Sequence, residues 1–497
     1  MDTSIFSYCF SSESIENGGM SVNYRFGKYY LSVDSKTPYH AFKNQSCECA
    51  LFGYAVNLVT AKHDCIPEQI LMDCNSIEEV VEYEKNLGGK YVIFYKNGEA
   101  YYILGDATLS IPVFYSLTGA VICTNLFQCI VEKCNLTADP EYMKIREQGE
   151  ISQAMPFDIT VYKEIKQLIP NHYYDVNNAK AVRFVNAHNK QNKMSIEEAT
   201  DKALPLIDVL TRYYQSVFKI NCPITSGRDS RVVLAFLLAN GFNGSCYTIK
   251  HPEHNEKTQD IVIPQEICSA MDVPYTMITD VELTKSVIDK MDHLFGKGNY
   301  STRTLRIAQT IKEYCVDSAI INGDIIGQVG KCSLHRDIPS CFATPAYFRC
   351  KLHNYSNEAK KQLGFWLDEI KQSGEQINMF DLFSIENRMG RWAAQENLIY
   401  NALGQVYLNI FNSRSIIYIW TAVNRKLRKK SLIHIDLIDK KAPALLDIPF
   451  EQDESIVIKL SKANGIFYLL SSYLKYHIEK QLFFRRKNHE KTDNNSR

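Results

Sequence analysis

The run Thr225-Ser226-Gly227-Arg228-Asp229-Ser230 decides how this chain of 497 residues is interpreted. A short apolar stretch, Cys222-Pro223-Ile224, precedes it, and a mostly apolar segment, residues 231–239, follows it. This order predicts a buried strand, a tight turn of small residues and a helix. Free backbone N–H groups and the positive end of the helix dipole would make the turn a cradle for a phosphate or pyrophosphate. The alternative is a capped helix start without a ligand, because Asp and Ser are common capping residues.

Asp229 places an acid where a phosphate would bind. A Walker loop has Gly-Lys-Ser/Thr at its end, whereas Gly227 here is followed by Arg228 and then the acid. A carboxylate repels phosphate unless a divalent cation lies between them. We therefore interpret Asp229 as a magnesium ligand.

Strands and helices are expected to alternate around this run. A capping box at residues 195–198 opens a long amphipathic helix that contains Pro205. Further strands are predicted at 245–249, 274–278 and 317–321, and a helix at 258–272. Such alternation is typical of a parallel sheet, which binds ligands at the carboxyl ends of its strands.

The first part of the chain has a different pattern and is expected to be mainly β. Short apolar or alternating runs end at turn residues, and Lys96-Asn97-Gly98-Glu99 predicts a hairpin. The polar segment 186–194 lacks periodicity and is expected to be a linker. We thus expect the division 1–185, linker 186–194, 195–480 and a tail at 481–497.

The composition limits the classes of partner that we expect for this protein. Lys plus Arg and Asp plus Glu both total 56, so no net charge favours nucleic acid. The 15 cysteines are scattered along the chain. The nearest pair, in Cys47-Glu48-Cys49, does not have the Cys-x-x-Cys spacing of zinc or redox sites, so we expect reduced thiols. With no signal-like start and no long apolar run, we expect a cytoplasmic protein without a membrane partner.

The 225–230 run resembles the pyrophosphatase loop of the asparagine synthetase family, Ser-Gly-Gly-x-Asp-Ser. The segments 87–93, 105–107 and 112–115 resemble that family's glutamine-amidotransferase domain. The resemblance implies an α+β, Ntn-hydrolase-like N-terminal domain. An α/β domain of the adenine nucleotide alpha hydrolase type (PP-loop) with a helical C-terminal part would follow it. The variant form is similar to a divergent branch related to β-lactam synthetase and lasso peptide cyclase.

Two departures from the family pattern bear on activity. The family's glutaminase uses an N-terminal cysteine as nucleophile, but position 2 is Asp2 and Cys9 is not terminal. We expect that glutaminase activity is lost. The second departure concerns a later acid of the family, which contacts magnesium. This chain has Gly327 at the position of that acid and Gln328 at the position of the Glu that follows it. Asp324 is therefore the remaining candidate ligand.

The resemblance implies an ATP-dependent, AMP-forming amide ligase that needs ATP and Mg²⁺. Its substrates would be a small-molecule or peptide carboxylate and an amine donor, and a homodimer is left open. The expected catalytic residues are Asp229, Lys426 and Arg425, although the cations at 425–430 would also suit a solvated helix face. Asp229 and Asp324 are the expected metal ligands. The expected nucleotide-binding residues are Thr225, Ser226, Gly227, Arg228, Ser230, Tyr247, Thr248, Asp260 and Gly323.

Two other functions remain open. A nucleotide-binding pseudoenzyme would tolerate the losses at Gly327 and Gln328. The same loop would also serve to activate an RNA carbonyl, as in some tRNA-modifying relatives, but the zero net charge weakens that hypothesis.

Overall fold

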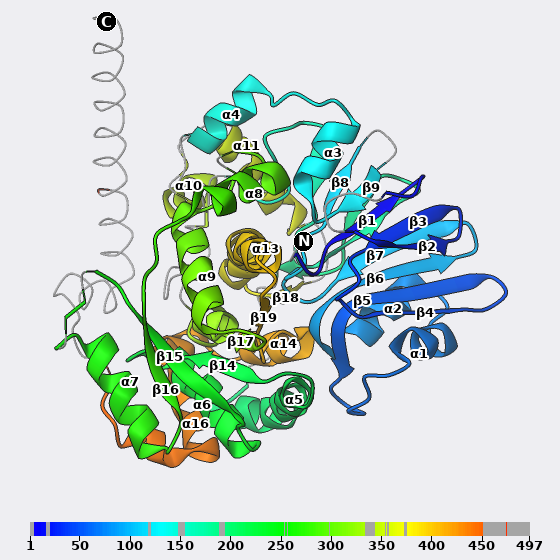
Figure 1. Cartoon of the computed structure of the whole chain (residues 1–497). Coiled ribbons are helices and arrows are strands. Elements are labelled where there is room, and N and C mark those ends of the chain that lie inside the picture. The colour runs from blue at the N-terminus through cyan, green and yellow to red at the C-terminus, as the bar shows by residue number, and fades with distance from the viewer. Residues whose placement is uncertain are drawn as a thin grey trace, which may run out of the picture.

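The computed structural model describes most of the chain in two adjoining parts (Figure 1). The described residues are 4–15, 20–117, 121–147, 155–187, 194–252, 254–255, 257–297, 299–332, 343–352, 354, 357–371, 375–450 and 474. The tail expected at 481–497 lies outside them. No helix in this described portion is long and apolar enough to cross a bilayer.

The N-terminal part contains two antiparallel six-stranded sheets. The first has the order β10-β8-β9-β1-β3-β2, with the bounds Ile165–Gln167, Phe114–Ser116, Val121–Thr124, Tyr8–Ser11, Tyr29–Val33 and Val22–Phe26. The second has the order β12-β11-β7-β6-β5-β4, with the bounds Lys180–Arg183, His172–Asp175, Ala100–Gly105, Leu87–Asn97, Cys47–Asn57 and Tyr39–Lys43. The predicted hairpin is confirmed: Asn97 pairs with Ala100 across a turn in which Gly98 has a φ of 57°.

Aromatic side chains fill the space between the two sheets. Tyr8 and Phe10 on β1 pack edge-on or tilted against Phe94 on β6. Two helices, α1 (Ile66–Asp73) and α2 (Ile77–Glu84), pack on the other face of the second sheet. Helices α3 (Phe127–Lys133) and α4 (Pro140–Glu147) complete this part.

A parallel five-stranded sheet forms the centre of the second part. Its order is β16-β15-β14-β17-β19, with the bounds Tyr275–Thr279, Gly244–Lys250, Ile220–Pro223, Ala319–Ile321 and Val406–Leu408. Every neighbouring pair is parallel. The four predicted strands are confirmed to within a few residues. The fifth, β19, was not predicted because its three residues are too few to show a period.

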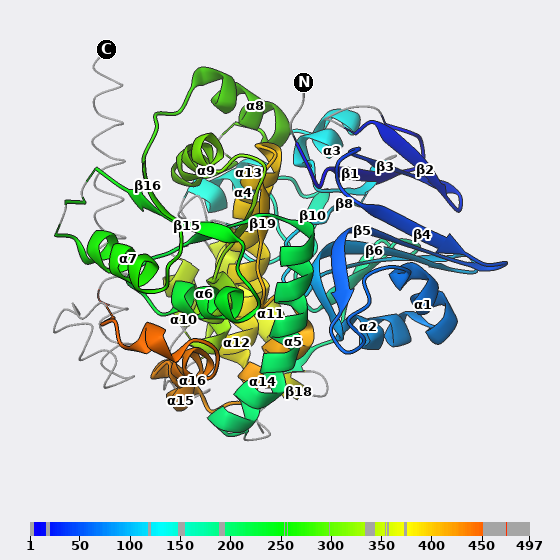
Figure 2. The same ribbon diagram turned by 60° about the horizontal axis from the view of Figure 1, so that its bottom comes forward.

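Helices cover both faces of this sheet because successive strand residues point to opposite sides. Cys246 and Ile321 belong to the core that also contains residues of α5 (Ile196–Val217) and α6 (Asp229–Ala239). Tyr247 and Ile320 belong to the core formed with α8 (Lys285–Phe295) and α9 (Thr302–Tyr314). Helix α7 (Gln259–Ala270) packs beside β15 (Figure 2). The predicted helix start is confirmed, since the Ser195 side chain accepts a hydrogen bond from the Glu198 N–H, which is one of the two bonds of a capping box.

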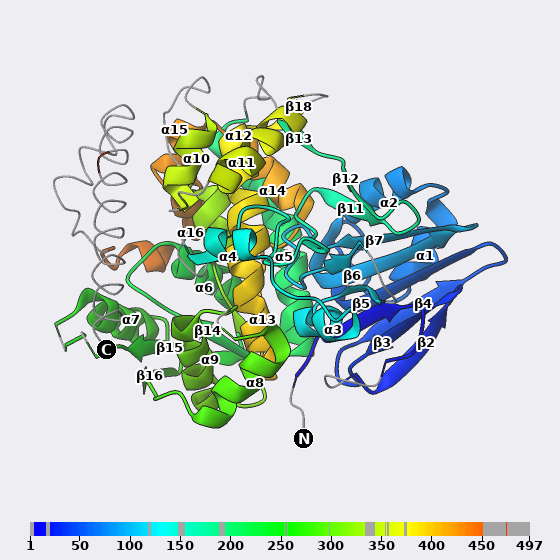
Figure 3. The ribbon, with the colours of Figure 1, turned by 90° about the horizontal axis from the view of Figure 1, so that it is seen from above.

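The C-terminal region is helical, as expected. Its elements are η1 (Ile326–Gly330), α10 (Pro345–Leu352), α11 (Asn357–Glu369), α12 (Met379–Phe383), η3 (Ser384–Ala393), α13 (Ala394–Ala402), α14 (Arg414–Thr421), α15 (Arg425–Lys429), α16 (Leu432–Lys441) and η4 (Pro443–Leu446). Both η1 and η3 are π-helical. Figure 3 shows α13 in the middle of the molecule, between α8 and α9 on one side and the N-terminal sheets on the other.

Buried polar contacts join the two parts. The Lys90 ammonium of β6 donates to the Oδ1 atoms of Asn397 and Asn401 on α13 (2.7 and 2.9 Å). Arg414 of α14 forms an ion pair with Glu84 at 2.6 Å, with both side chains buried. At the ends of the expected linker, Asn186–Ala187 (β13) pairs with Glu375–Ile377 (β18), and the Met194 N–H donates to the Ala422 carbonyl. Residues 188–193 lie outside the described residues.

Candidate functional site

Five chain segments leave the parallel sheet at one edge, which we call the carboxyl edge. The 225–230 turn follows β14, and Asn322 to Asp324 follow β17. His251, Asp280 and Asn409 each come directly after a strand: β15, β16 and β19. Because all five strands are parallel, these residues share one side of the sheet. The predicted phosphate loop therefore lies where this fold type binds ligands.

Hydroxyl groups hold the 225–230 turn in shape. The Thr225 N–H donates to the Ser230 hydroxyl at 3.2 Å, and the Gly227 N–H donates to the Thr225 hydroxyl at 3.3 Å. Arg228 is the N-cap residue of α6, and its side chain makes no capping hydrogen bond.

Asp260, in the first turn of α7, organises the same turn from the side. Its Oδ1 accepts hydrogen bonds from the Ser226 N–H at 2.9 Å and the Ser226 hydroxyl at 2.5 Å. Ser226 is fully buried, so these two donors need a partner inside the protein. Asp260 thus supports the turn, while its expected binding of the nucleotide stays a prediction.

Arg231 supports the turn through hydrogen bonds to backbone carbonyls, a role that the sequence did not indicate. Its guanidinium donates to the carbonyls of Ile448 and Pro449, both at 2.6 Å, and to that of Ser226 at 3.3 Å. The Phe450 ring lies 4.2 Å from the Arg231 guanidinium carbon and 4.6 Å from that of Arg228. The segment after η4 thus braces the start of α6.

Asp229 lies in the first turn of α6 and faces two other elements. Its Oδ1 is 2.9 Å from Nε2 of His434 on α16. A Cβ added to Gly327 of η1 would lie 2.6 Å from its Oδ2, and one added to Gly323 would lie 3.3 Å from its Cβ. Burial would raise the pKa of Asp229, but the His434 hydrogen bond, with the charges of His434, Lys331 and Arg228, lowers it below the ordinary value. The carboxylate is therefore ionised at neutral pH.

Two further acids, Asp324 and Glu396, influence the electrostatics of this region: the charge of Asp229 acts on Asp324, and the charge of Asp324 acts on Glu396. Burial raises the pKa of Asp324 to about 6, against the hydrogen bond that its Oδ2 accepts from the Tyr407 hydroxyl at 3.3 Å. Burial and the charge of Asp324 raise the pKa of Glu396 to about 8. Raised carboxyl pKa values at a ligand-binding edge are typical of groups that exchange protons.

These acids fit a magnesium site only together with a ligand. Among the described residues, no group of three or more His, Cys, Asp or Glu side chains is arranged to hold a metal. Mg²⁺ usually binds one or two carboxylates together with substrate phosphates and water. The Asp229 side chain is 39% exposed and is charged, so it suits that mode of binding.

Tyr247 and Thr248 are less open than their expected role requires. Tyr247 is buried in the core on one face of the sheet. The Thr248 hydroxyl donates to the Ile224 carbonyl at 2.7 Å and is also buried. Both residues support the strand that leads to the edge, and neither side chain is turned toward solvent.

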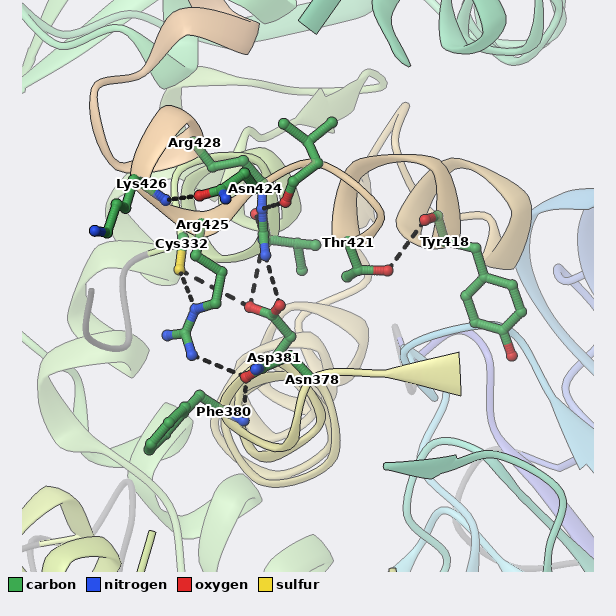
Figure 4. A network of polar contacts seen from close by, with 12 residues as sticks. Cys332, Asn378, Phe380, Asp381, Tyr418, Thr421, Asn424, Arg425, Lys426 and Arg428 are labelled. Atoms are coloured by element: carbon green, nitrogen blue, oxygen red, sulfur yellow. Dashed lines mark hydrogen bonds and ion pairs between the residues drawn. The ribbon is translucent and has the colours of Figure 1, made fainter. Parts of the chain in front are cut away.

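Among the cations at 425–430, Arg425 and Arg428 are buried, whereas Lys426 and Lys430 are exposed. Figure 4 shows the polar contacts of the two buried arginines. Arg425 donates to Cys332 Sγ at 3.0 Å and to the Asn378 side chain at 2.8 Å. Arg428 donates to both carboxylate oxygens of Asp381 and to the Val329 carbonyl of η1. The alternative that all the cations at 425–430 lie on a solvated helix face is therefore wrong. The Lys426 side chain is exposed and extends away from this cluster.

A small cavity with polar and apolar walls lies where the N-terminal part meets the carboxyl edge. Its wall includes Lys90 and Ser110 from the N-terminal part and Asp324, Asn409 and Asn412 from the second part. The free space is about 20 Å³, enough for a water molecule. Burial lowers the pKa of Lys90 to about 7, although Asp106 and the hydrogen-bond acceptors around Lys90 favour its charged form.

Cys9 is not placed as a nucleophile. It is fully buried within β1, and a hydrogen bond with Cys129, together with burial, raises its pKa well above the ordinary value. A thiol held in its protonated form is a poor nucleophile. Asp2 lies outside the described residues.

No family model and no curated protein matches the chain. Among solved structures, it is similar to the NMN synthetase of Francisella tularensis, with 11% identity over 53% of this chain and 100% of that chain and a TM-score of 0.19. The glutamine-dependent NAD⁺ synthetase of Acinetobacter baumannii, solved in complex with ADP, has 11% identity over 52% and 66% and a TM-score of 0.20. The glutamine phosphoribosylpyrophosphate amidotransferase of B. subtilis has 11% identity over 68% and 79% and a TM-score of 0.21. At these TM-scores the likeness is distant and assigns no function.

Proposed function

We propose that this protein is an ATP-dependent, AMP-forming ligase that joins a substrate carboxylate to an amine, in the manner of the asparagine synthetases. One observation carries the proposal: the 225–230 turn, which contains Asp229, lies at the carboxyl edge of the parallel sheet. The turn combines small residues, a helix start and an acid that suits magnesium. These are the features needed to hold a polyphosphate.

The reaction would have two steps. In the first, a carboxylate oxygen attacks the α-phosphorus of ATP and pyrophosphate departs, giving an acyl-adenylate. In the second, an amine attacks the acyl carbon, the bond to AMP breaks, and the amine loses a proton. Bound magnesium would supply electrostatic stabilisation of the departing pyrophosphate.

The chain's own residues suit these steps. The 225–230 backbone would hold the pyrophosphate end, with Asp260 fixing Ser226. Asp324 stays the candidate for a second metal ligand beside Asp229, and the amine proton would pass to solvent. Because Cys9 is buried with a raised pKa, the amine would come from a free donor rather than from glutamine.

Pyrophosphate exchange tests the proposal. Purified protein is incubated with ATP, Mg²⁺, labelled pyrophosphate and a panel of amino acids, sugar acids and peptides. Label should enter ATP only when a carboxylate that the enzyme accepts is present. ATP binding without exchange across the panel would instead favour a nucleotide-binding pseudoenzyme, which the glycine at position 327 would permit.

A further inference from the structure

His434 is a buried histidine that contacts Asp229, the proposed metal ligand. It lies on α16, which packs against α6, and its side chain has no exposed surface. Its Nε2 meets Asp229 Oδ1 at 2.9 Å. In the described part of the chain Nδ1 has no hydrogen-bond partner, so the hydrogen on Nε2 serves Asp229.

Gly327 leaves space for the other oxygen of the Asp229 carboxylate. Its missing side chain leaves room that Asp229 Oδ2 occupies, since an added Cβ would approach that oxygen to 2.6 Å. One oxygen is thus held by an imidazole and the other lies against the backbone of η1. Together these contacts fix the rotation of the carboxylate.

We propose that His434 is a positioning residue for the Asp229 carboxylate, in a site that lacks the second acid at position 327. The inference rests on the proposed function, because it assigns Asp229 to a metal that accompanies ATP. With Oδ1 held by His434, Oδ2 is the oxygen left to meet the cation. Partners that orient a metal-binding group in this way commonly change metal affinity by about 10- to 100-fold.

A purely structural role for His434 makes a different prediction. His434 would then matter only as a side chain of suitable volume in the packing of α16 against α6. A leucine would preserve most of that volume without a donor, whereas a glutamine would offer an N–H in place of the imidazole N–H. The two substitutions separate volume from hydrogen bonding.

The experiment measures Mn²⁺ binding by electron paramagnetic resonance in the presence of a non-hydrolysable ATP analogue. We compare the full-length wild type with His434→Leu, His434→Gln and the packing control Leu437→Ala, one turn further along α16 and also buried. Circular dichroism and thermal unfolding identify the folded fraction of each variant. Because the readout is binding, it does not require the unknown substrate.

We expect His434→Leu to weaken Mn²⁺ binding by about tenfold or more. His434→Gln should recover most of this loss, and Leu437→Ala should bind Mn²⁺ as the wild type does. Equal affinity in wild type and His434→Leu, or equal losses in the Leu and Gln variants, would overturn the role of His434 alone. If the wild type with the analogue binds no Mn²⁺, both this inference and the metal-dependent ligase fail.

Discussion

The carboxylate of Asp260 accepts both hydrogen bonds that the buried Ser226 offers, at 2.9 Å from its backbone nitrogen and 2.5 Å from its hydroxyl. Asp260→Ala would remove the acceptor of both of these hydrogen bonds from the protein interior, at a cost of about 1–3 kcal/mol each. We expect ATP binding to weaken by about tenfold or more, as measured by calorimetry. Glu266→Ala, an exposed acid on the same helix, is the control and should leave ATP binding unchanged.

Arg231 should contribute to the free energy of unfolding, because it links the 225–230 turn to the segment 443–450. Arg231→Leu removes the donors to four backbone carbonyls, those of Ser226, Leu445, Ile448 and Pro449, so the free energy of unfolding should fall by about 3 kcal/mol in urea titrations. Arg212→Leu makes the same change at an exposed site on α5 and should cost less than about 0.5 kcal/mol. Equal losses in the two variants would show that the 443–450 segment does not brace α6.

Gly327→Ala tests the space beside Asp229. The new Cβ would lie 2.6 Å from Oδ2, so the carboxylate must move. Pyrophosphate exchange should drop by at least about tenfold, because displacement of a positioned group by a few tenths of an ångström to 1 Å is costly in catalysis. Gly364→Ala on α11 meets nothing within 4 Å and should leave exchange unchanged. Normal exchange in Gly327→Ala would place Asp229 outside the reaction.

Lys90 should make stability depend on pH. Its folded pKa of about 7 lies below the value of 10.5 for a free lysine, so the unfolded chain binds more protons between these pH values. The contribution of Lys90 to the free energy of unfolding should therefore increase as pH rises from 7 toward 10, by about 1–2 kcal/mol up to pH 9.

Lys90→Met isolates this contribution. The variant should show a smaller rise in unfolding free energy between pH 7 and 9 than the wild type. Lys180→Met, at an exposed position on β12, should keep the full rise. Parallel pH profiles for wild type and Lys90→Met would mean that the pKa of Lys90 is not lowered by its burial between the two parts.

Local patterns were enough to predict four of the five strands of the parallel sheet and the turn at 225–230. The segment from Cys222 to Ala239 contains its own strand, turn and helix signals, and the structure has β14 and α6 there. The partners of this turn could not be predicted in the same way. His434 is 205 residues from Asp229, and one histidine on an amphipathic helix has no local pattern that indicates its partner.

The same limit explains the remaining differences. Charge clustering at 425–430 favoured a solvated face, but Arg425 and Arg428 are buried because Asn378 and Asp381, on a distant segment, supply their acceptors. The three residues of β19 become a strand only through pairing with β17. Lys90 meets α13 across the two parts of the molecule, more than 300 positions away. Each of these contacts depends on tertiary packing, which periodicity does not encode.

AMP production by an Asp229→Asn variant tests the central claim most directly. The substitution keeps the size of the side chain and removes its charge, so the protein should remain folded while its hold on the metal is lost. With a carboxylate that supports turnover in the wild type, we predict that AMP formation falls by at least about a hundredfold, with Asp289→Asn on the exposed face of α8 as an unaffected control. AMP formation at the wild-type rate in Asp229→Asn would contradict the account.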